Sequence, residues 1–143
     1  MPHLFHELIY HTAERGIHSD ALIDQKRQIS YPELAEAVHS TSQALLALGL
    51  GRGERLAVYL EKRLETVVAL FSTSAAGGAF VPINPLLKAE QVAYILNDCN
   101  VRVLVTSNER LNFLKPVLPQ CHDLHAVIVT GETADFPLAT GLT

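Results

Sequence analysis

Hydrophobic positions along this chain repeat with two periods, one typical of helices and one typical of short buried strands. The helical period comes first and predicts an amphipathic helix over residues 4–14. Two short strand-like segments at 21–23 and 28–30 follow, and the polar residues between them predict a β-hairpin. The chain is therefore expected to open with a small helix and a hairpin.

A second helix is predicted directly after the hairpin. Ser30 is suited to cap its first turn, and Pro32 is a residue that helices tolerate near their start. Glu33 stands three residues after Ser30, so the two side chains can form a capping box. The helical period continues to Gly49, where we expect the helix to end.

Beyond residue 50, strand-like and helical segments alternate. Apolar runs predict four strands, over residues 55–60, 79–82, 101–105 and 126–129. The helices between them are marked by apolar stripes, namely Leu64, Val67, Val68, Phe71 and Ala75 in the first and Val92, Ile95, Leu96 and Cys99 in the second; the third is predicted over residues 108–114. Strands that alternate with helices imply a parallel sheet with both faces covered. The predicted fold class is α/β, with a doubly wound, mostly parallel sheet on which the stripe of Phe71 packs.

Composition excludes several classes of protein. The 143 residues are 48% hydrophobic and 18% charged, which excludes intrinsic disorder. Eleven basic and fifteen acidic residues give a net charge of -4, so binding of nucleic acid or of an anionic membrane is not expected. No apolar run has the length of a membrane span, and the N-terminus lacks the features of a signal peptide. A soluble, cytoplasmic protein without a membrane span is expected, and its two cysteines fit a reducing compartment.

Two glycine-rich stretches, Gly49–Gly53 and Gly77-Gly78, each follow a helix and precede a strand. A phosphate-binding loop has the opposite order, because the N-terminus of the helix must face the anion. Both stretches are therefore interpreted as helix C-caps and turns.

Histidine and cysteine positions raise the hypothesis of a metal site. His3 and His6 are three residues apart, as are His122 and His125, and the second pair follows Cys121. No cluster of carboxylates accompanies either pair, so surface histidines are the preferred interpretation. Cys99 completes the apolar stripe of its helix and is expected to be buried and inert.

Other polar residues offer weaker candidates. The run Ser72–Ser74 lies within a helix and lacks the strand–turn–helix setting of a hydrolase nucleophile. Arg102 and Arg110 lie near the ends of one strand–helix unit, where they could bind an anion, although a solvated pair is the preferred interpretation. Asn84, between Pro82 and Pro85, follows a strand at the edge where open α/β sheets bind ligands. A rigid crossover loop is the alternative there, and it is preferred.

Three successive motifs nevertheless resemble one family. They are 29-ISYPEL-34, 48-LGLGRGERLAV-58 and 75-AAGGAFVPINP-85, with the strand 104-LVT-106 in the expected place after them. Their types and order are similar to the start of the AMP-forming acyl-CoA synthetases, over about residues 4–131. The stretch from Val58 to Leu111 looks most like the acyl-CoA ligases associated with exosortase systems.

This resemblance implies an enzyme that uses ATP, magnesium and coenzyme A. A carboxylic acid is first joined to AMP with release of pyrophosphate, and the acyl group then passes to the thiol of coenzyme A. The family's phosphate loop, its adenine and ribose motifs and its C-terminal catalytic lysine have no counterpart in this sequence, and Gly131-Glu132-Thr133 is not that loop. The resemblance therefore carries over no catalytic, cofactor-binding or metal-binding residue.

Residues 1–143 are accordingly expected to be the N-terminal portion of the ligase's large N-terminal domain, with 132–143 as an irregular tail. Alone, this portion should be inactive and bind no cofactor tightly. It should also self-associate through surface that the rest of the lobe would cover. The alternative from another class is a free-standing flavodoxin-like module that binds a nucleotide or a protein partner.

Overall fold

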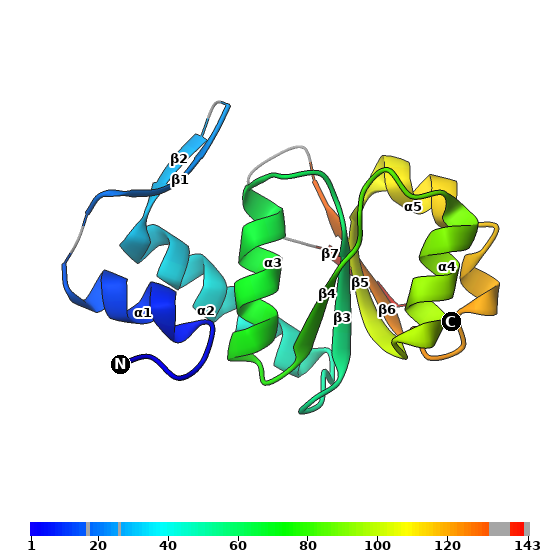
Figure 1. Cartoon of the computed structure of the whole chain (residues 1–143), viewed down its shortest axis with the longest axis horizontal. Coiled ribbons are helices and arrows are strands. Elements are labelled where there is room, and N and C mark those ends of the chain that lie inside the picture. Colours follow the sequence, from blue (N-terminus) through cyan, green and yellow to red (C-terminus); the bar gives the residue numbers. More distant parts are fainter. Residues whose placement is uncertain (17, 26, 132–137, 142–143) are drawn as a thin grey trace.

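The computed structural model describes residues 1–16, 18–25, 27–131 and 138–141 of the chain. Helices and strands follow one another in the order that the hydrophobic periods predict (Figure 1). They form a layer of helices with a hairpin, a central sheet, and a second layer of helices on the far face of that sheet. The predicted α/β fold class is confirmed.

The N-terminal layer consists of α1 (Glu7–Glu14), the hairpin strands β1 (Asp20–Asp24) and β2 (Arg27–Ser30), and α2 (Tyr31–Ala47). The hairpin is antiparallel, as predicted. The capping box at the start of α2 is also confirmed: the Glu33 carboxylate accepts a hydrogen bond from the Ser30 amide at 2.7 Å, and the Ser30 hydroxyl accepts one from the Glu33 amide at 3.4 Å.

The central sheet has the strand order β4-β3-β5-β6-β7. Its parallel part comprises β3 (Arg55–Tyr59), β4 (Ala79–Pro82), β5 (Val101–Ser107) and β6 (Ala126–Thr130). The connecting helices are α3 (Leu64–Ala75), α4 (Ala89–Asp98) and α5 (Asn108–Leu114), and the 3-10 helix η1 (Leu118–Gln120) precedes β6. Helices cover both faces of this sheet, so it is doubly wound as predicted.

The end of the chain departs from the prediction. The expected irregular tail at 132–143 contains a strand, because β7 (Leu138–Gly141) pairs antiparallel with β6. The expectation therefore does not hold for these four residues, and the rest of the tail lies outside the described residues. The sheet is mostly parallel, with one antiparallel edge.

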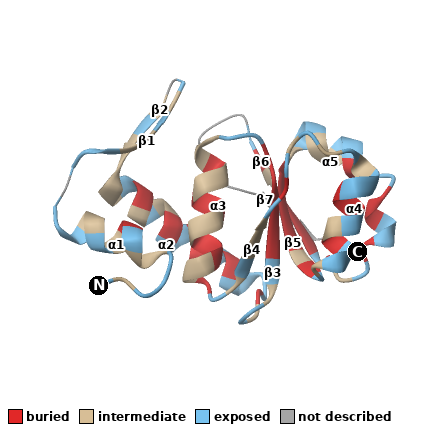
Figure 2. Ribbon diagram, in the orientation of Figure 1, coloured by how far each residue is buried: buried red, intermediate tan, exposed pale blue. Residues whose placement is uncertain are grey.

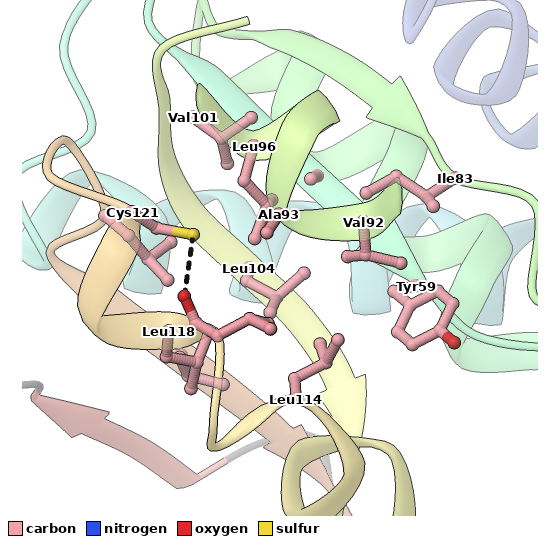
Figure 3. Packing of buried hydrophobic residues seen from close by; sticks show 14 residues of the cluster. Tyr59, Ile83, Val92, Ala93, Leu96, Val101, Leu104, Leu114, Leu118 and Cys121 are labelled. Atoms are coloured by element: carbon pink, nitrogen blue, oxygen red, sulfur yellow. Dashed lines mark hydrogen bonds between the residues drawn. The ribbon is translucent and has the colours of Figure 1, made fainter. Parts of the chain in front are cut away.

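Alternating residues of the strands supply two cores (Figure 2). In β3, Ala57 and Tyr59 face α4 and α5, where they join a cluster that contains Val92, Leu96 and Leu104 (Figure 3). The intervening β3 residues face α2 and α3. Because side chains alternate along a strand, one buried strand feeds both layers.

The orientation of α3 corrects the prediction that the Phe71 stripe packs on the sheet. Val68 is fully buried among residues of α1 and α2, and Phe71 packs on the same cluster, with its ring stacked 4.3 Å from that of Phe5. The small residues Ala69 and Ala76 face the sheet instead. Since α3 lies between two layers, both of its faces are covered, and Val68 and Phe71 point away from the sheet.

Both glycine-rich stretches end helices, as predicted. Gly49 and Gly77 have φ angles of +91° and +83°. After α2, the Leu50 amide donates to the Leu45 carbonyl at 3.1 Å, and after α3 the Gly78 amide donates to the Thr73 carbonyl at 2.9 Å. These bonds, together with the left-handed glycines, are the Schellman type of helix end.

One further expectation is corrected. Cys99 is only partly buried at the C-cap of α4, whereas the fully buried cysteine is Cys121. The described helices include none that is both long and apolar enough to cross a membrane.

Candidate functional site

The site most suited to function lies at the carboxyl ends of β3 and β5. These strands are neighbours in the sheet. The chain passes from β3 to β4 on one side of this pair, and from β5 to β6 on the other side. Such a reversal leaves a crevice at the carboxyl edge of the sheet, which is where open α/β folds bind ligands. The segments that reach this edge are the loop after β3, the loop after β4, the start of α5 and the end of β6.

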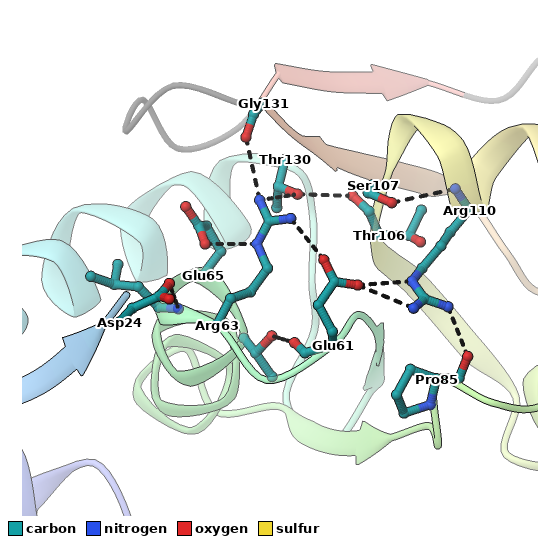
Figure 4. Close-up of polar contacts among 12 residues, drawn as sticks. Asp24, Glu61, Arg63, Glu65, Pro85, Thr106, Ser107, Arg110, Thr130 and Gly131 are labelled. Carbon is teal, nitrogen blue, oxygen red and sulfur yellow. Dashed lines mark hydrogen bonds and ion pairs between the residues drawn. The ribbon is translucent and has the colours of Figure 1, made fainter. Parts of the chain in front are cut away.

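Arg63 lies at the centre of this edge (Figure 4). Its guanidinium donates to the carboxylates of Glu65 at 2.9 Å and Glu61 at 3.2 Å. It also donates to the Thr130 hydroxyl at 3.1 Å and to the Gly131 carbonyl at 3.3 Å. One side chain from the β3–α3 loop therefore holds the end of β6.

The hairpin reaches the same edge through β1 and β2. Arg27 donates to the two carboxylate oxygens of Glu65, at 2.6 and 3.1 Å, and to Asp24 at 3.0 Å. Asp24 in turn accepts a hydrogen bond from the Leu64 amide at 3.4 Å. Arg63, the N-cap residue of α3, gives that helix no side-chain cap, so a strand of the hairpin supplies one.

On the other side of the edge, Arg110 of α5 completes the row of charges. It binds Glu61 at 3.1 Å and donates to the Pro85 carbonyl at 2.8 Å. Its guanidinium also lies 4.9 Å from the centre of the Tyr59 ring. The hydroxyl of the buried Tyr59 donates to the Leu87 carbonyl at 2.8 Å, so two side chains fix the loop after β4.

We call these six side chains the carboxyl-edge network; in order they are Asp24, Arg27, Glu65, Arg63, Glu61 and Arg110. Their signs alternate, and three arginines balance three carboxylates. Such a network neutralises its own charge and fixes the loops that carry it.

Glu65 has the most altered acidity in the network. Burial by itself raises the pKa of this carboxyl group, but hydrogen bonds from Arg27 and Arg63 outweigh it and lower the pKa to about 2. The pKa of Glu61 is also lowered: burial opposes this change, and hydrogen bonds from its own backbone, Arg63 and Arg110 produce it. Both carboxylates are therefore charged at neutral pH.

A hollow of about 380 Å³ opens beside the network at the carboxyl ends of β3 and β4. Tyr59 and Phe113 supply aromatic walls, while Lys88 and Arg110 supply positive charge. Leu86 at its rim is 88% exposed. The Arg110 guanidinium already donates to the Glu61 carboxylate and the Pro85 carbonyl. Lys88 is therefore the more available cation of the hollow.

The structure places the sequence-derived candidates apart from one another. Asn84 does lie at the carboxyl edge, where its side-chain oxygen accepts a hydrogen bond from the Leu86 amide at 2.9 Å and so supports its own loop. Arg102 and Arg110 do not form a pair. Arg102, near the start of β5, bonds His125 and lies 3.6 Å from Glu54, whereas Arg110 lies in the helix that follows the end of the same strand. An anion site between the two arginines is thereby contradicted.

The histidine and cysteine candidates take up separate contacts. His6 bonds the Ser74 hydroxyl at 2.9 Å, and His125 bonds Arg102. The Cys121 thiol donates to the Val117 carbonyl, and burial raises its pKa. Within the described part of the chain, no three histidine, cysteine or acidic side chains are grouped in a way that could hold a metal ion.

The serine and threonine residues of α3 form no hydrolase site. Thr73 donates to the Ala69 carbonyl at 2.7 Å, and Ser74 pairs with His6. Ser72 is fully buried, and among the described residues its hydroxyl is the one buried side-chain polar atom without a hydrogen-bond partner. None of the three is exposed at the carboxyl edge.

The side chains of the carboxyl-edge network offer no unpaired group to ATP or magnesium, which the family resemblance implies. The phosphates of ATP need free backbone amides at the start of a helix or unpaired cationic side chains. At this edge Arg27, Arg63 and Arg110 are all engaged by carboxylates. No step of an adenylation reaction can be assigned to the side chains of this site.

Glu61, Arg63 and Glu65 were not predicted from the sequence as residues of a site. A signal was available, because charged residues follow the buried strand β3 at once, in the segment Glu61-Lys62-Arg63. Their partners Arg27 and Thr130 are distant in the sequence, so only the folded chain shows the network.

Comparison with known proteins identifies the class of protein to which this chain belongs. A family model described as "AMP-binding enzyme" matches residues 9–140. The chain is 30% identical to tyrocidine synthase 3 of Brevibacillus parabrevis, over 88% of this chain and 2% of the synthase. It is 32% identical to tyrocidine synthase 1 of the same organism, over 71% of this chain and 9% of that protein.

Solved structures agree. The anthranilate CoA ligase AuaEII, in complex with anthranoyl-AMP, superposes with a TM-score of 0.86 at 25% identity, over 95% of this chain and 27% of the ligase. A protein described as a putative long-chain-fatty-acid CoA ligase from Rhodopseudomonas palustris superposes with a TM-score of 0.84 at 17% identity, over 92% of this chain, and supports the fold alone.

The fold is therefore that of the N-terminal region of adenylate-forming enzymes. The chain belongs to the AMP-binding enzyme family. It spans only 2–9% of the length of the tyrocidine synthases and about a quarter of the anthranilate ligase. This membership favours the adenylate-forming class over the flavodoxin-like alternative.

Proposed function

We propose that this chain is the N-terminal portion of an ATP-dependent acyl-CoA ligase and provides a structural part of its large domain. In this proposal the whole enzyme joins a carboxylic acid to AMP and then forms a thioester with coenzyme A, while magnesium assists at the phosphates. The observation that carries the proposal is the superposition of 95% of the chain on a CoA ligase that holds an acyl-AMP.

The proposal includes inactivity of the chain by itself. The sequence contains no Ser/Thr/Gly-rich phosphate loop, and the arginines of the carboxyl-edge network are already paired. The network is accordingly assigned the role of fixing the loops at the carboxyl edge. ATP, magnesium and coenzyme A are not expected to bind this portion tightly.

Relatives in the tyrocidine synthases favour a second candidate, in which the chain is part of an adenylate-forming unit of a larger synthase. Activation of an acid by ATP is common to both candidates, and the acceptor of the acyl group distinguishes them. The finer placement among exosortase-associated ligases stays a prediction. A cytoplasmic location belongs to the same proposal and is supported by two cysteines that form no disulfide.

A chimera tests the proposed function. This chain would replace its superposed counterpart in the anthranilate CoA ligase, and formation of anthranoyl-AMP and then anthranoyl-CoA would be measured. We expect the chimera to form both products, whereas the ligase without its N-terminal counterpart should form neither. A chimera that folds, as judged by a cooperative melt, but forms no acyl-AMP would contradict the proposal.

A further inference from the structure

The hairpin and the end of β6 belong to different sheets. Among the residues that the structure describes, β1 and β2 pair only with each other, whereas β6 lies in the five-stranded sheet. No ladder of backbone hydrogen bonds can therefore transmit order from one to the other. Side chains of the carboxyl-edge network do join them.

The connection runs through a single carboxylate. On one side, Arg27 of β2 holds both oxygens of Glu65. On the other side, Arg63 donates to Glu65 and, through the same guanidinium, to Thr130 and Gly131 at the end of β6. Two guanidinium groups thus meet at one side chain, and Figure 4 shows the side of Glu65 that faces Arg63.

Burial makes this carboxylate sensitive to the loss of either partner. The Glu65 side chain is only 7% exposed, so water cannot replace a lost guanidinium easily. Without Arg27, Glu65 must either draw Arg63 closer or move toward solvent. Each response changes the position of the Arg63 guanidinium, which also has to reach Thr130 and Gly131.

A second contact strengthens the connection. Asp24 of β1 accepts hydrogen bonds from both Arg27 and the first amide of α3. Release of the hairpin would therefore also uncap α3, the helix on which Glu65 lies. The hairpin acts on Glu65 directly through Arg27 and indirectly through the helix.

We propose that Glu65 couples docking of the β1–β2 hairpin to the order of the chain at the end of β6. The coupling is a conformational device of this fold, and it does not depend on the proposed ligase function. A partner or ligand that displaces the hairpin would loosen the carboxyl edge, and disorder at that edge would loosen the hairpin, since coupling free energies are reciprocal.

Amide hydrogen exchange of the 143-residue chain tests the coupling. Arg27→Met keeps the length of the side chain but removes its charge and its donors. We expect exchange to rise in the hairpin and also, by at least about five-fold, in a peptide covering residues 126–131. The reciprocal variant Thr130→Val removes one acceptor of Arg63 and should raise exchange in β1 and β2. Arg55→Met, at an exposed arginine where β3 begins, is the control and should change neither region.

Two results would overturn the coupling. One is faster exchange in the hairpin of Arg27→Met with no change at residues 126–131. The other is an equal rise in the buried centre of β5 around Leu104, because uniform acceleration reports global destabilisation rather than a link between two sites. Should Arg27→Met fail to fold, Asp24→Asn provides the milder perturbation of the same link, with the same two criteria.

Discussion

Arg27 and Glu65 are 38 positions apart in the sequence, yet their side chains meet through two hydrogen bonds of 2.6 and 3.1 Å. The contact fastens the β1–β2 hairpin to the first turn of α3. Because Asp24 contacts Arg27 and Arg63 approaches the same carboxylate, the pair lies within a row of charges that crosses the carboxyl edge of the sheet. A buried carboxylate with two guanidinium partners should dominate the response of this protein to acid.

Glu65→Gln is expected to destabilise the chain by about 3 kcal/mol at pH 7, because it removes the charge from a buried position held between two arginines. The pKa of Glu65 is lowered to about 2, below its ordinary value of 4.5. The stabilisation is therefore present above about pH 5 and is lost as the pH falls toward 2. Urea unfolding of both proteins between pH 7 and 2 measures it. The two stabilities should converge in acid, and parallel curves would contradict the assignment.

Ser72→Ala is expected to change stability by less than about 0.5 kcal/mol or to stabilise the chain slightly. The Ser72 hydroxyl is buried without a hydrogen-bond partner among the described residues. Its removal therefore eliminates a desolvation cost that no hydrogen bond offsets. Ser72→Val, which adds volume at the same fully buried position, serves as the control and should cost about 1–3 kcal/mol. Thermal melts of the two variants distinguish them. A large loss in Ser72→Ala would mean that the hydroxyl has a partner after all.

The aromatic stack between Phe5 and Phe71 should make these residues energetically coupled. Their rings are 4.3 Å apart and nearly parallel, with an interplanar angle of 3°. A double-mutant cycle of Phe5→Ala and Phe71→Ala is expected to give a coupling energy of about 0.5–1.5 kcal/mol. Strictly additive effects would show that Phe71 is held by other contacts and that the segment before α1 does not pack on α3.

Self-association is expected through an apolar surface formed by Leu86, Tyr94 and Phe113, which are 88%, 70% and 51% exposed. Two adjoining hollows that share Leu87 connect them. Lys88 lines one of these hollows and Glu90 the other, so charges of both signs border the apolar surface. Light scattering at high concentration should give a mass above that of the monomer.

The variant Leu86→Lys/Tyr94→Lys should reduce that mass to 15.7 kDa, the mass of one chain. Ile23→Lys on the hairpin, at an equally exposed position, is the matched control and should leave the association intact. A parent chain that is monomeric at every concentration would refute this prediction.

Local rules were sufficient to predict most of the fold. The Ser30–Glu33 capping box and the left-handed Gly49 and Gly77 mark helix ends in the sequence, because each depends on residues a few positions apart. The orientation of α3 could not be predicted in the same way. Its apolar stripe shows which face is buried but not by what, and in this fold Val68 and Phe71 meet other helices rather than the sheet.

The candidate site was less predictable than the fold. Asn84 was correctly placed at the carboxyl edge from its position after a strand. Glu65 lies in a helix among apolar residues, and its significance depends on Arg27, which the hairpin brings in from a distant part of the sequence. Pairings of that kind are set by tertiary structure, and no spacing rule contains them.

The most direct test of the account is whether the chain forms acyl-adenylates by itself. Purified chain, ATP and magnesium would be mixed with a panel of fatty and aromatic carboxylic acids, and release of pyrophosphate would be measured alongside the melting temperature with and without ATP. We predict no release above background and no ATP-dependent shift of the melting temperature, because the arginines of the carboxyl edge are already paired and the sequence has no phosphate loop. Release of pyrophosphate that requires an added carboxylic acid and persists through repurification, together with stabilisation by ATP, would contradict the proposed inactivity of the chain by itself.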